Sequence, residues 1–164
     1  MSFLEKLKDA GVIIRAPISL KNAGKSDVYF DIKKAYGDPS LLREIAVAMI
    51  EQLPPETNCV AVEGHGGIPL GTVISLITGY NLTFVRKSPK GYGLSKMLDG
   101  HLPIEEDRIV VVDDVFTTGK SLRDMIDVLT KSRGKVVGAG VVVKRGDGEI
   151  SVPLRYLFTA EDLL

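Results

Sequence analysis

The sequence is poor in cysteine, has no tryptophan and carries no excess of either charge. Its one cysteine, Cys59, rules out an intrachain disulfide and suits a reducing interior, so we expect a cytoplasmic protein. Cys59 opens the apolar run Cys59–Val62, where a buried, inert thiol is expected rather than a nucleophile. The 21 basic and 21 acidic residues cancel. No nucleic-acid or membrane partner is therefore expected, and any anion site must be a local arrangement.

Long apolar runs are missing as well. No stretch reaches the roughly 20 residues that a membrane-spanning helix needs, and segment 1–9 lacks the apolar core of a signal peptide. The 164 residues show no repeat, low-complexity tract or linker, and they suffice for one domain with its own core. We therefore expect a single domain over 1–164.

Strand and helix patterns alternate along most of the chain, which predicts a parallel α/β sheet. Two segments break this alternation, because 20–32 reads as an irregular loop leading into a strand and 86–106 as a long polar loop. The predicted strands are 12–14, 58–62, 82–85, 109–112, 136–143 and 156–158, and the predicted helices are 2–10, 38–53, 68–79 and a helix after Gly119.

The segment Arg108–Ser121 is the most informative part of the chain. Its apolar run Ile109–Val112 predicts a buried strand that ends in two carboxylates, Asp113 and Asp114. The turn Thr117–Gly119 then leads into an amphipathic helix. Where a parallel strand feeds a helix amino terminus, the free N–H groups favour a phosphate. The acid pair repels a phosphate, so it should contact sugar hydroxyls or a metal on the same ligand. A phosphate with a vicinal diol describes a ribose 5-phosphate group.

Two other interpretations of this segment compete with the sugar-phosphate site. Gly119-Lys120-Ser121 resembles the end of a nucleotide-binding P-loop, but such a loop needs a glycine where Asp114 stands. A buried strand with a solvated polar turn would need no ligand at all. That interpretation does not explain why three hydroxyl donors, Thr117, Thr118 and Ser121, follow the acid pair in the sequence.

Glycines gather in the segment Glu63–Leu70, between a predicted strand and a predicted helix. Gly64, Gly66 and Gly67 allow positive φ and let backbone N–H groups turn toward an anion. A simple tight turn is the alternative. Beside a second phosphate site, the segment is better interpreted as a pyrophosphate loop, in which His65 either donates to the ligand or is solvated.

Cations gather at two further places. Arg86–Gly93 opens the long loop with three basic side chains, which repel one another unless an anion is bound, and this indicates a lid over a pyrophosphate. A solvated basic loop is the alternative there. Lys144 and Arg145 end a strand near the proposed sugar site, where an arginine is suited to clamp a carboxylate, although a surface arginine in a turn fits equally.

Together these segments resemble the type I phosphoribosyltransferases, and from about residue 21 to 145 the orotate phosphoribosyltransferases among them. The resemblance implies an open, mainly parallel α/β sheet flanked by helices, with a small hood over about 1–35, a core over about 36–164 and a lid over about 86–106. It implies Mg²⁺-dependent transfer of a 5-phosphoribosyl group from 5-phosphoribosyl 1-pyrophosphate (PRPP) to orotate, giving orotidine 5′-phosphate and pyrophosphate in UMP biosynthesis. A purine phosphoribosyltransferase and a non-catalytic PRPP-sensing regulator are the alternatives.

The resemblance also assigns partners and roles. Family members are homodimers in which the lid of one subunit covers the site of the other, and Mg²⁺ is held mainly by PRPP and water rather than by protein ligands. Tyr92 stands where the family commonly has a histidine, and it cannot become cationic. The residues 23–25 carry one extra position relative to common members. The implied catalytic residues are Lys90, Asp113 and Asp114; PRPP would contact Arg86, Lys87, Lys90, Tyr92, Asp113, Asp114, Val115, Phe116, Thr117, Thr118, Gly119, Lys120 and Ser121; the pyrophosphate loop is Gly64, His65, Gly66 and Gly67; and orotate would contact Lys21, Phe30, Thr117 and Arg145.

Overall fold

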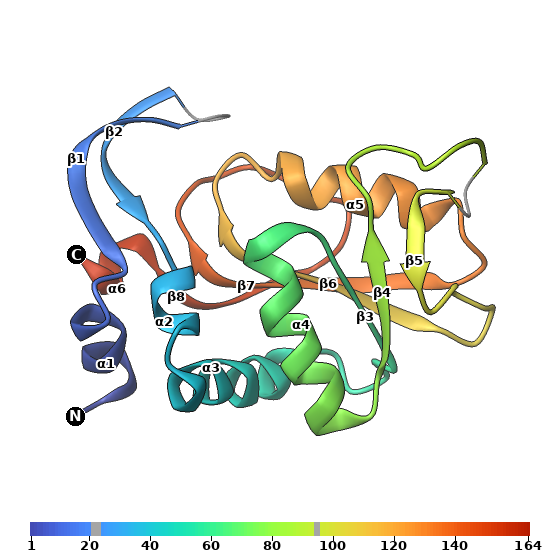
Figure 1. Ribbon diagram of the computed structural model, residues 1–164, viewed down its shortest axis with the longest axis horizontal. Coiled ribbons are helices and arrows are strands. Elements are labelled where there is room, and N and C mark those ends of the chain that lie inside the picture. Colours follow the sequence, from blue (N-terminus) through green and yellow to red (C-terminus); the bar gives the residue numbers. More distant parts are fainter. Residues whose placement is uncertain (21–23, 94–95) are drawn as a thin grey trace.

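The computed structural model describes residues 1–20, 24–93 and 96–164, with side chains omitted at 16–20 and 24–26. A six-stranded sheet carries helices on both faces, and a separate two-stranded hairpin stands at the end where both termini lie (Figure 1). Within the described ranges, no helix is both long and apolar enough to cross a membrane. In chain order the elements are α1 (Phe3–Asp9), β1 (Ile13–Leu20), β2 (Gly24–Phe30), α2 (Lys33–Tyr36), α3 (Pro39–Gln52), β3 (Cys59–Val62), α4 (Gly64–Thr78), β4 (Asn81–Val85), β5 (Leu98–Gly100), β6 (Arg108–Phe116), α5 (Lys120–Thr130), β7 (Lys135–Lys144), β8 (Leu154–Thr159) and α6 (Ala160–Leu163).

The large sheet has the strand order β5-β4-β3-β6-β7-β8. Its strands pair in parallel, except that β5 runs antiparallel to β4. The helices α4 and α5 connect β3 to β4 and β6 to β7, as parallel neighbours require. The prediction of a mainly parallel α/β sheet is therefore confirmed, and β6 occupies the middle of it.

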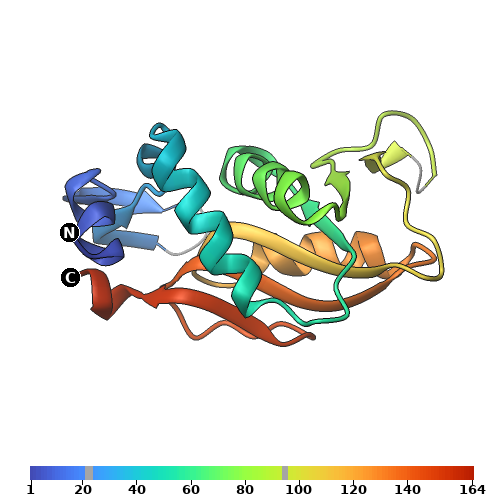
Figure 2. The ribbon, with the colours of Figure 1, turned by 90° about the horizontal axis from the view of Figure 1, so that it is seen from below.

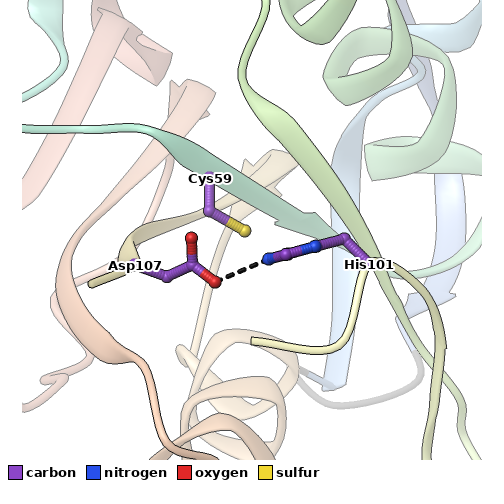
Figure 3. A group of neighbouring side chains, drawn as sticks. All are labelled: Cys59, His101 and Asp107. Atoms are coloured by element: carbon purple, nitrogen blue, oxygen red, sulfur yellow. Dashed lines mark hydrogen bonds and ion pairs between the residues drawn. The ribbon is translucent and has the colours of Figure 1, made fainter. Parts of the chain in front are cut away.

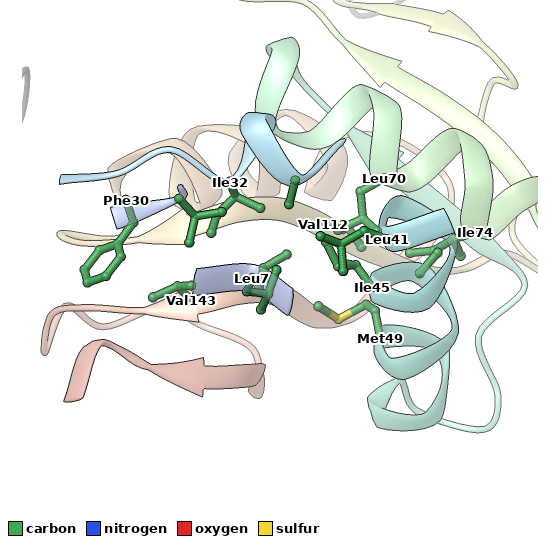
Figure 4. Packing of buried hydrophobic residues seen from close by; sticks show 14 of the residues in the cluster. Leu7, Phe30, Ile32, Leu41, Ile45, Met49, Leu70, Ile74, Val112 and Val143 are labelled. Carbon is green, nitrogen blue, oxygen red and sulfur yellow. The ribbon is translucent and has the colours of Figure 1, made fainter. Parts of the chain in front are cut away.

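The two faces of the sheet carry separate apolar clusters. Figure 2 shows α3 and α4 covering one face and α5 the other. Along β6 the buried side chains alternate, so Val110 and Val112 join the cluster under α3 and α4, whereas Ile109 and Val111 join the cluster under α5. Figure 4 shows the first cluster, in which Val112 lies among side chains from α3 and α4. Fully burying such a side chain contributes about 1.5–3 kcal/mol, so both faces hold β6 in place.

The N-terminal hairpin corrects the prediction for 20–32. An irregular loop leading into a strand was expected there, and the structure shows that the strand already begins at Gly24 and runs to Phe30 as β2, which pairs antiparallel with β1 from Ile13 opposite Phe30. Strand pairing satisfies the backbone donors and acceptors in a way that local composition does not reveal. The hairpin lies within the segment of about 1–35 for which the family resemblance predicts a hood, and that role stays a prediction.

Several further boundaries differ from the predictions, and the first strand, expected at 12–14, runs from Ile13 to Leu20. The central strand continues through the acid pair to Phe116, because β7 pairs alongside it as far as Lys144. Helix α4 begins at Gly64 rather than near residue 68. The polar segment 86–106 contains β5, which folds back on β4. The short helices α2 and α6 were not predicted, because four residues are too few for a helical period.

Candidate active site

The acid pair lies near the carboxyl end of β6, in the middle of the sheet. Asp113 is 9% exposed, and Asp114 is half-buried. The backbone N–H of Asp114 donates to Asp113 Oδ1, and that of Val115 donates to Asp114 Oδ1, both at 2.9 Å. These bonds fix the direction in which each carboxylate points.

The pair is electrostatically strained, and a lysine of the hood region relieves part of that strain. Burial and the neighbouring Asp114 raise the pKa of Asp113 to about 7. Lys33 Nζ lies 3.4 Å from Asp114 Oδ2 and 3.2 Å from Asp31 Oδ1. Burial by itself would lower the pKa of Lys33, but the two carboxylates outweigh it and raise that pKa. Lys33 therefore stays charged and partly neutralises the acid pair.

The first turn of α4, the predicted pyrophosphate loop, packs directly on the end of β6. Gly64 has a φ of +63°, but Gly66 and Gly67 do not have positive φ, which corrects the reason given for these two glycines. A Cβ on Gly66 would come within 2.8 Å of Asp113 Oδ1, and one on Gly67 within 2.7 Å of the Val112 carbonyl oxygen. Because Gly66 and Gly67 have no Cβ, the free N–H groups of this turn can approach the acid pair.

Tyr36 connects this turn to the short helix α2. Its hydroxyl donates to the Gly66 carbonyl oxygen at 2.9 Å. Burial, together with the charges of the acid pair, raises the pKa of the phenol, so Tyr36 acts as a neutral donor. His65 in the same turn is exposed. The turn is thereby held between β6 and α2.

The predicted phosphate site lies at the start of α5. Gly119, with a φ of +81°, caps the helix, and the N–H of Lys120 donates to Thr118 Oγ1 at 3.3 Å. Lys120 and Ser121 are exposed in the first turn. Free N–H groups and hydroxyls therefore face the solvent at a helix amino terminus, as an anion site requires.

The turn before α5 is held from outside by a neighbouring loop. Gly146 and Gly148 pass so close to the carbonyl oxygens of Thr117 and Thr118 that a Cβ on either glycine would overlap them. Arg123 also donates to the Thr118 carbonyl oxygen at 2.8 Å. Main-chain contacts therefore fix the shape of the predicted phosphate loop.

Val115 and Phe116 occupy packed positions between the acid pair and this turn. Phe116 is 2% exposed and belongs to the cluster under α5, and Val115 packs against the opposite cluster. Their side chains point into the two apolar layers. A contact with PRPP at these two positions would have to come from the backbone.

The lid residues lie on the extension of the β4–β5 hairpin, which projects from the body of the molecule (Figures 1 and 2). Arg86 Nη1 forms an ion pair with Asp99 Oδ2 at 3.0 Å at the base of the hairpin. Lys87 and Lys90 are exposed, and Tyr92 is 97% exposed. The charged tip of the hairpin therefore stands in solvent in this conformation.

A cleft of about 390 Å³ separates the base of this hairpin from the starts of α4 and α5. Three cations line it, which suits a pyrophosphate. Burial raises the pKa of Glu63, which lies in the same wall. The lining residues are Glu63, Val85, Arg86, Lys87, Met97, Lys120, Ser121, Asp124 and Val128.

Of the four residues assigned to the base, Phe30 and Arg145 lie together at the end of β7. Arg145 Cζ lies 5.9 Å from the ring centroid of Phe30, and the Arg145 N–H donates to the Phe116 carbonyl oxygen at 2.8 Å. Phe30 is 2% exposed and Thr117 is half-buried. Lys21 lies outside the described residues. An arginine held over a hood aromatic, next to the acid pair's strand, can receive a carboxylate.

Sequence reasoning missed four residues that shape the site. These are Asp31, Lys33 and Tyr36, which link α2 to the acid pair and to α4, and Glu63, which lines the cleft. The charged residues of segment 31–34 are the sequence feature that points to Asp31 and Lys33. They do not show whether Lys33 or Lys34 points toward the acid pair.

Comparison with known proteins shows the family to which the chain belongs. The family model of the phosphoribosyl transferase domain matches residues 59–155. The orotate phosphoribosyltransferase of Methanosarcina acetivorans is 39% identical over 165 residues, covering 96% of this chain and 88% of its own. That of Methanothermobacter thermautotrophicus is 36% identical over 147 residues, covering 90% and 81%. The crystal structure of orotate phosphoribosyltransferase from Aeropyrum pernix superposes with a TM-score of 0.86 at 30% identity, covering 99% of this chain and 96% of the other. The chain therefore belongs to the phosphoribosyltransferase family, and within it to the orotate phosphoribosyltransferases.

Proposed function

We propose that this protein transfers the 5-phosphoribosyl group of PRPP to N1 of orotate, giving orotidine 5′-phosphate and pyrophosphate. The observation that carries the proposal is the acid pair at the end of β6, held against the first turn of α4 and next to the amino terminus of α5. One ligand can place its sugar hydroxyls on the pair, its 5-phosphate at α5 and its pyrophosphate toward α4.

The acid pair acts on the ribose. Loss of pyrophosphate makes C1 of the ring positively charged, in an oxocarbenium-like state. Asp113 and Asp114 accept hydrogen bonds from the ribose hydroxyls and lie where their charge stabilises that ring. Lys33, 3.4 Å from Asp114 Oδ2, balances part of the negative charge of the acid pair while the site is empty.

The leaving group is stabilised by the cleft beside α4. Negative charge that develops on pyrophosphate meets the N–H groups of the α4 turn and the cations Arg86, Lys87 and Lys120. Bound Mg²⁺ supplies further neutralisation of the pyrophosphate oxygens. Among the described residues, the acid pair is not part of a group of three or more ligand side chains. This donor set fits an ion held mainly by phosphate oxygens and water, with Asp113 and Asp114 nearby.

Arg145 selects the base. Orotate differs from uracil by a carboxylate, and a guanidinium can bind that group through two parallel hydrogen bonds. The position of Arg145 over Phe30 places its charge on the side of the site away from the pyrophosphate cleft. Pyrimidine specificity then comes from one charged pair rather than from the shared sugar-phosphate site.

The lid excludes water and completes the site. An oxocarbenium-like ribose would react with water, so the exposed hairpin carrying Lys87 and Lys90 must close after PRPP binds. In the proposed homodimer, this lid covers the site of the partner subunit.

Turnover with PRPP and Mg²⁺ tests the proposal directly. Orotate, uracil, adenine, hypoxanthine and xanthine are offered separately, and nucleotide formation is followed for each. Orotate alone should give rapid turnover, and Asp113→Asn and Asp114→Asn should lose most of it while remaining folded. Turnover of a purine without turnover of orotate would replace the pyrimidine assignment. PRPP binding without turnover of any base would favour a regulator.

A further inference from the structure

A second group of reactive side chains lies at the opposite edge of the sheet from the acid pair. Cys59 is the first residue of β3, and Asp107 directly precedes β6, so both stand where their parallel strands begin. His101 follows β5, which runs antiparallel and returns to the same edge. Figure 3 shows the three side chains converging from these three segments. The proposed reaction uses none of them.

The three side chains are close together and largely withdrawn from solvent. One donor atom from each, the Cys59 sulfur, a His101 ring nitrogen and an Asp107 oxygen, lies within 4.8 Å of the others. Cys59 is fully buried, Asp107 is 2% exposed, and the His101 side chain is 26% exposed. His101 Nε2 and Asp107 Oδ2 are 2.6 Å apart. The exposed edge of the imidazole gives an ion a path from solvent.

Neighbouring groups hold these ligands in position. The Thr83 hydroxyl donates to the His101 carbonyl oxygen at 2.7 Å, and the Ile104 N–H donates to Asp107 Oδ2 at 2.8 Å. Thr83 Oγ1 also lies 3.5 Å from the Cys59 sulfur. Supporting contacts of this kind orient metal ligands in known sites.

We propose that Cys59, His101 and Asp107 form a binding site for a divalent transition-metal ion of the zinc class. A thiolate, an imidazole and a carboxylate are the donors that zinc takes in proteins, with bonds of about 2.3, 2.0–2.1 and 2.0–2.2 Å. A tetrahedral ion with these bonds places its donors about 3.5 Å apart, so a cluster within 4.8 Å needs only small side-chain shifts. Water fills the fourth position.

The ion has a structural role. It ties the beginnings of β3 and β6 to the segment after β5, and so it fastens the returning end of the lid hairpin to the sheet. Mg²⁺ does not compete well, because it prefers oxygen donors over sulfur and imidazole. The proposed reaction does not use this metal site, so a failure of either proposal leaves the other unaffected.

Cobalt(II) is the probe for this site, because its spectrum reports both sulfur ligation and tetrahedral geometry. The full chain, freed of metal and kept reduced, is titrated with Co²⁺ in the presence of excess Mg²⁺. The chain has one cysteine, so a thiolate-to-cobalt charge-transfer band can come from Cys59 alone. We expect this band to saturate at one ion per chain, with release of the thiol proton, and to disappear when Zn²⁺ is added.

Variants separate this site from adventitious binding. Cys59→Ser should abolish the charge-transfer band, and His101→Gln should weaken Co²⁺ binding at least tenfold. His65→Asn removes the other histidine of the chain and should bind Co²⁺ as the wild type does. Zn²⁺ should raise the melting temperature of the wild type and of His65→Asn but not of Cys59→Ser.

If a substitution at a buried residue prevents folding, the Co²⁺ spectrum of the wild type still tests the proposal. A wild type that shows no thiolate band at stoichiometric Co²⁺ contradicts the proposal, whatever the variants do. Equal Co²⁺ affinity in wild type and Cys59→Ser also contradicts it, because the ion then binds elsewhere on the surface.

Discussion

At the end of β6, the balance between carboxylates and a lysine determines how single substitutions affect stability and activity. Asp31, Asp113 and Asp114 bring three carboxylates to one region, and Lys33 contacts two of them. Repulsion between Asp113 and Asp114 destabilises the empty protein. In the proposed reaction, the same two carboxylates accept hydrogen bonds from the ribose hydroxyls. Substitutions here should therefore separate stability from activity.

Asp113→Asn should alter how stability depends on pH. The pKa of Asp113 is raised to about 7, so the folded state binds this proton more tightly than the unfolded state does. The stabilisation is complete below about pH 4 and is lost as pH rises through about 7. Between about pH 5 and 8, the unfolding free energy of Asp113→Asn should therefore increase relative to wild type, by an amount on the order of a few kcal/mol.

Urea unfolding at several pH values measures this difference. Asp127→Asn is the matched control, because Asp127 is exposed on α5. A difference between Asp113→Asn and wild type that stays constant from acid to alkaline pH would contradict the prediction.

Lys33→Met should shift the pH dependence of catalysis. Removing the cation 3.4 Å from Asp114 leaves the negative charge of the acid pair less balanced, so the acid limb of kcat/KM, which reports the pair, should move up by about one pH unit. Lys33→Arg should restore the wild-type profile, and Lys34→Met, at an exposed neighbouring position, should leave it unchanged. An unshifted limb in Lys33→Met would show that Lys33 merely joins α2 to the sheet.

Arg145→Ala should lower kcat/KM for orotate far more than it weakens PRPP binding. Stranding one partner of a charge-assisted pair costs about 2–5 kcal/mol, which is roughly a 30-fold to several thousand-fold loss. Calorimetry should give nearly the wild-type Kd for PRPP, because Arg145 lies at the hood rather than in the cleft. Equal losses for orotate and PRPP would reassign Arg145 to a phosphate.

Among the elements, the long periodic or fully apolar segments were predictable and the short ones were not. The strand at 109–112 and the helix after Gly119 were predicted because their apolar patterns are set by burial alone. The extension of β6 to Phe116 depends on pairing with β7, which no local pattern records. Likewise, Arg145 and the acid pair could be proposed as site residues from the sequence, but the contact of Lys33 with Asp114 could not, because it joins segments 81 residues apart.

The lid hairpin should act on the chemical step rather than on binding. Lys90 is exposed, and in the proposed mechanism it meets the substrate only after the lid closes. Its charge is most useful when pyrophosphate is leaving, and Lys90→Ala should therefore lower kcat more than it raises the KM for PRPP. Steady-state kinetics beside Lys131→Ala, an exposed lysine just after α5, would check this. A change confined to KM would assign Lys90 to ground-state binding.

At the scale of the whole molecule, we predict that the lid of one subunit closes over the acid pair of a second subunit. In one chain the hairpin tip is exposed and stands apart from the body, which is compatible with closure over a partner (Figure 1). A lid that crosses the dimer makes each site a composite of two chains. This arrangement has a distinctive consequence for mixtures of inactive variants.

Mixing Lys90→Ala with Asp114→Asn should restore activity. A mixed dimer carries one site built from the intact lid of one subunit and the intact acid pair of the other. With random exchange in equal amounts, about one quarter of all sites are intact. Activity is measured after subunit exchange has been demonstrated with labelled chains. No recovery under those conditions would mean that each lid serves its own subunit.

The central place of β6 also matters while the chain is being made. β6 leaves the ribosome before β7, so the run Ile109–Val112 is for a time the unpaired margin of a growing sheet. A short, strongly apolar edge of this kind invites pairing with other chains until its proper neighbour arrives. The same strand that later carries the acid pair is therefore open to unwanted pairing in the nascent protein until residues 135–144 have docked beside it.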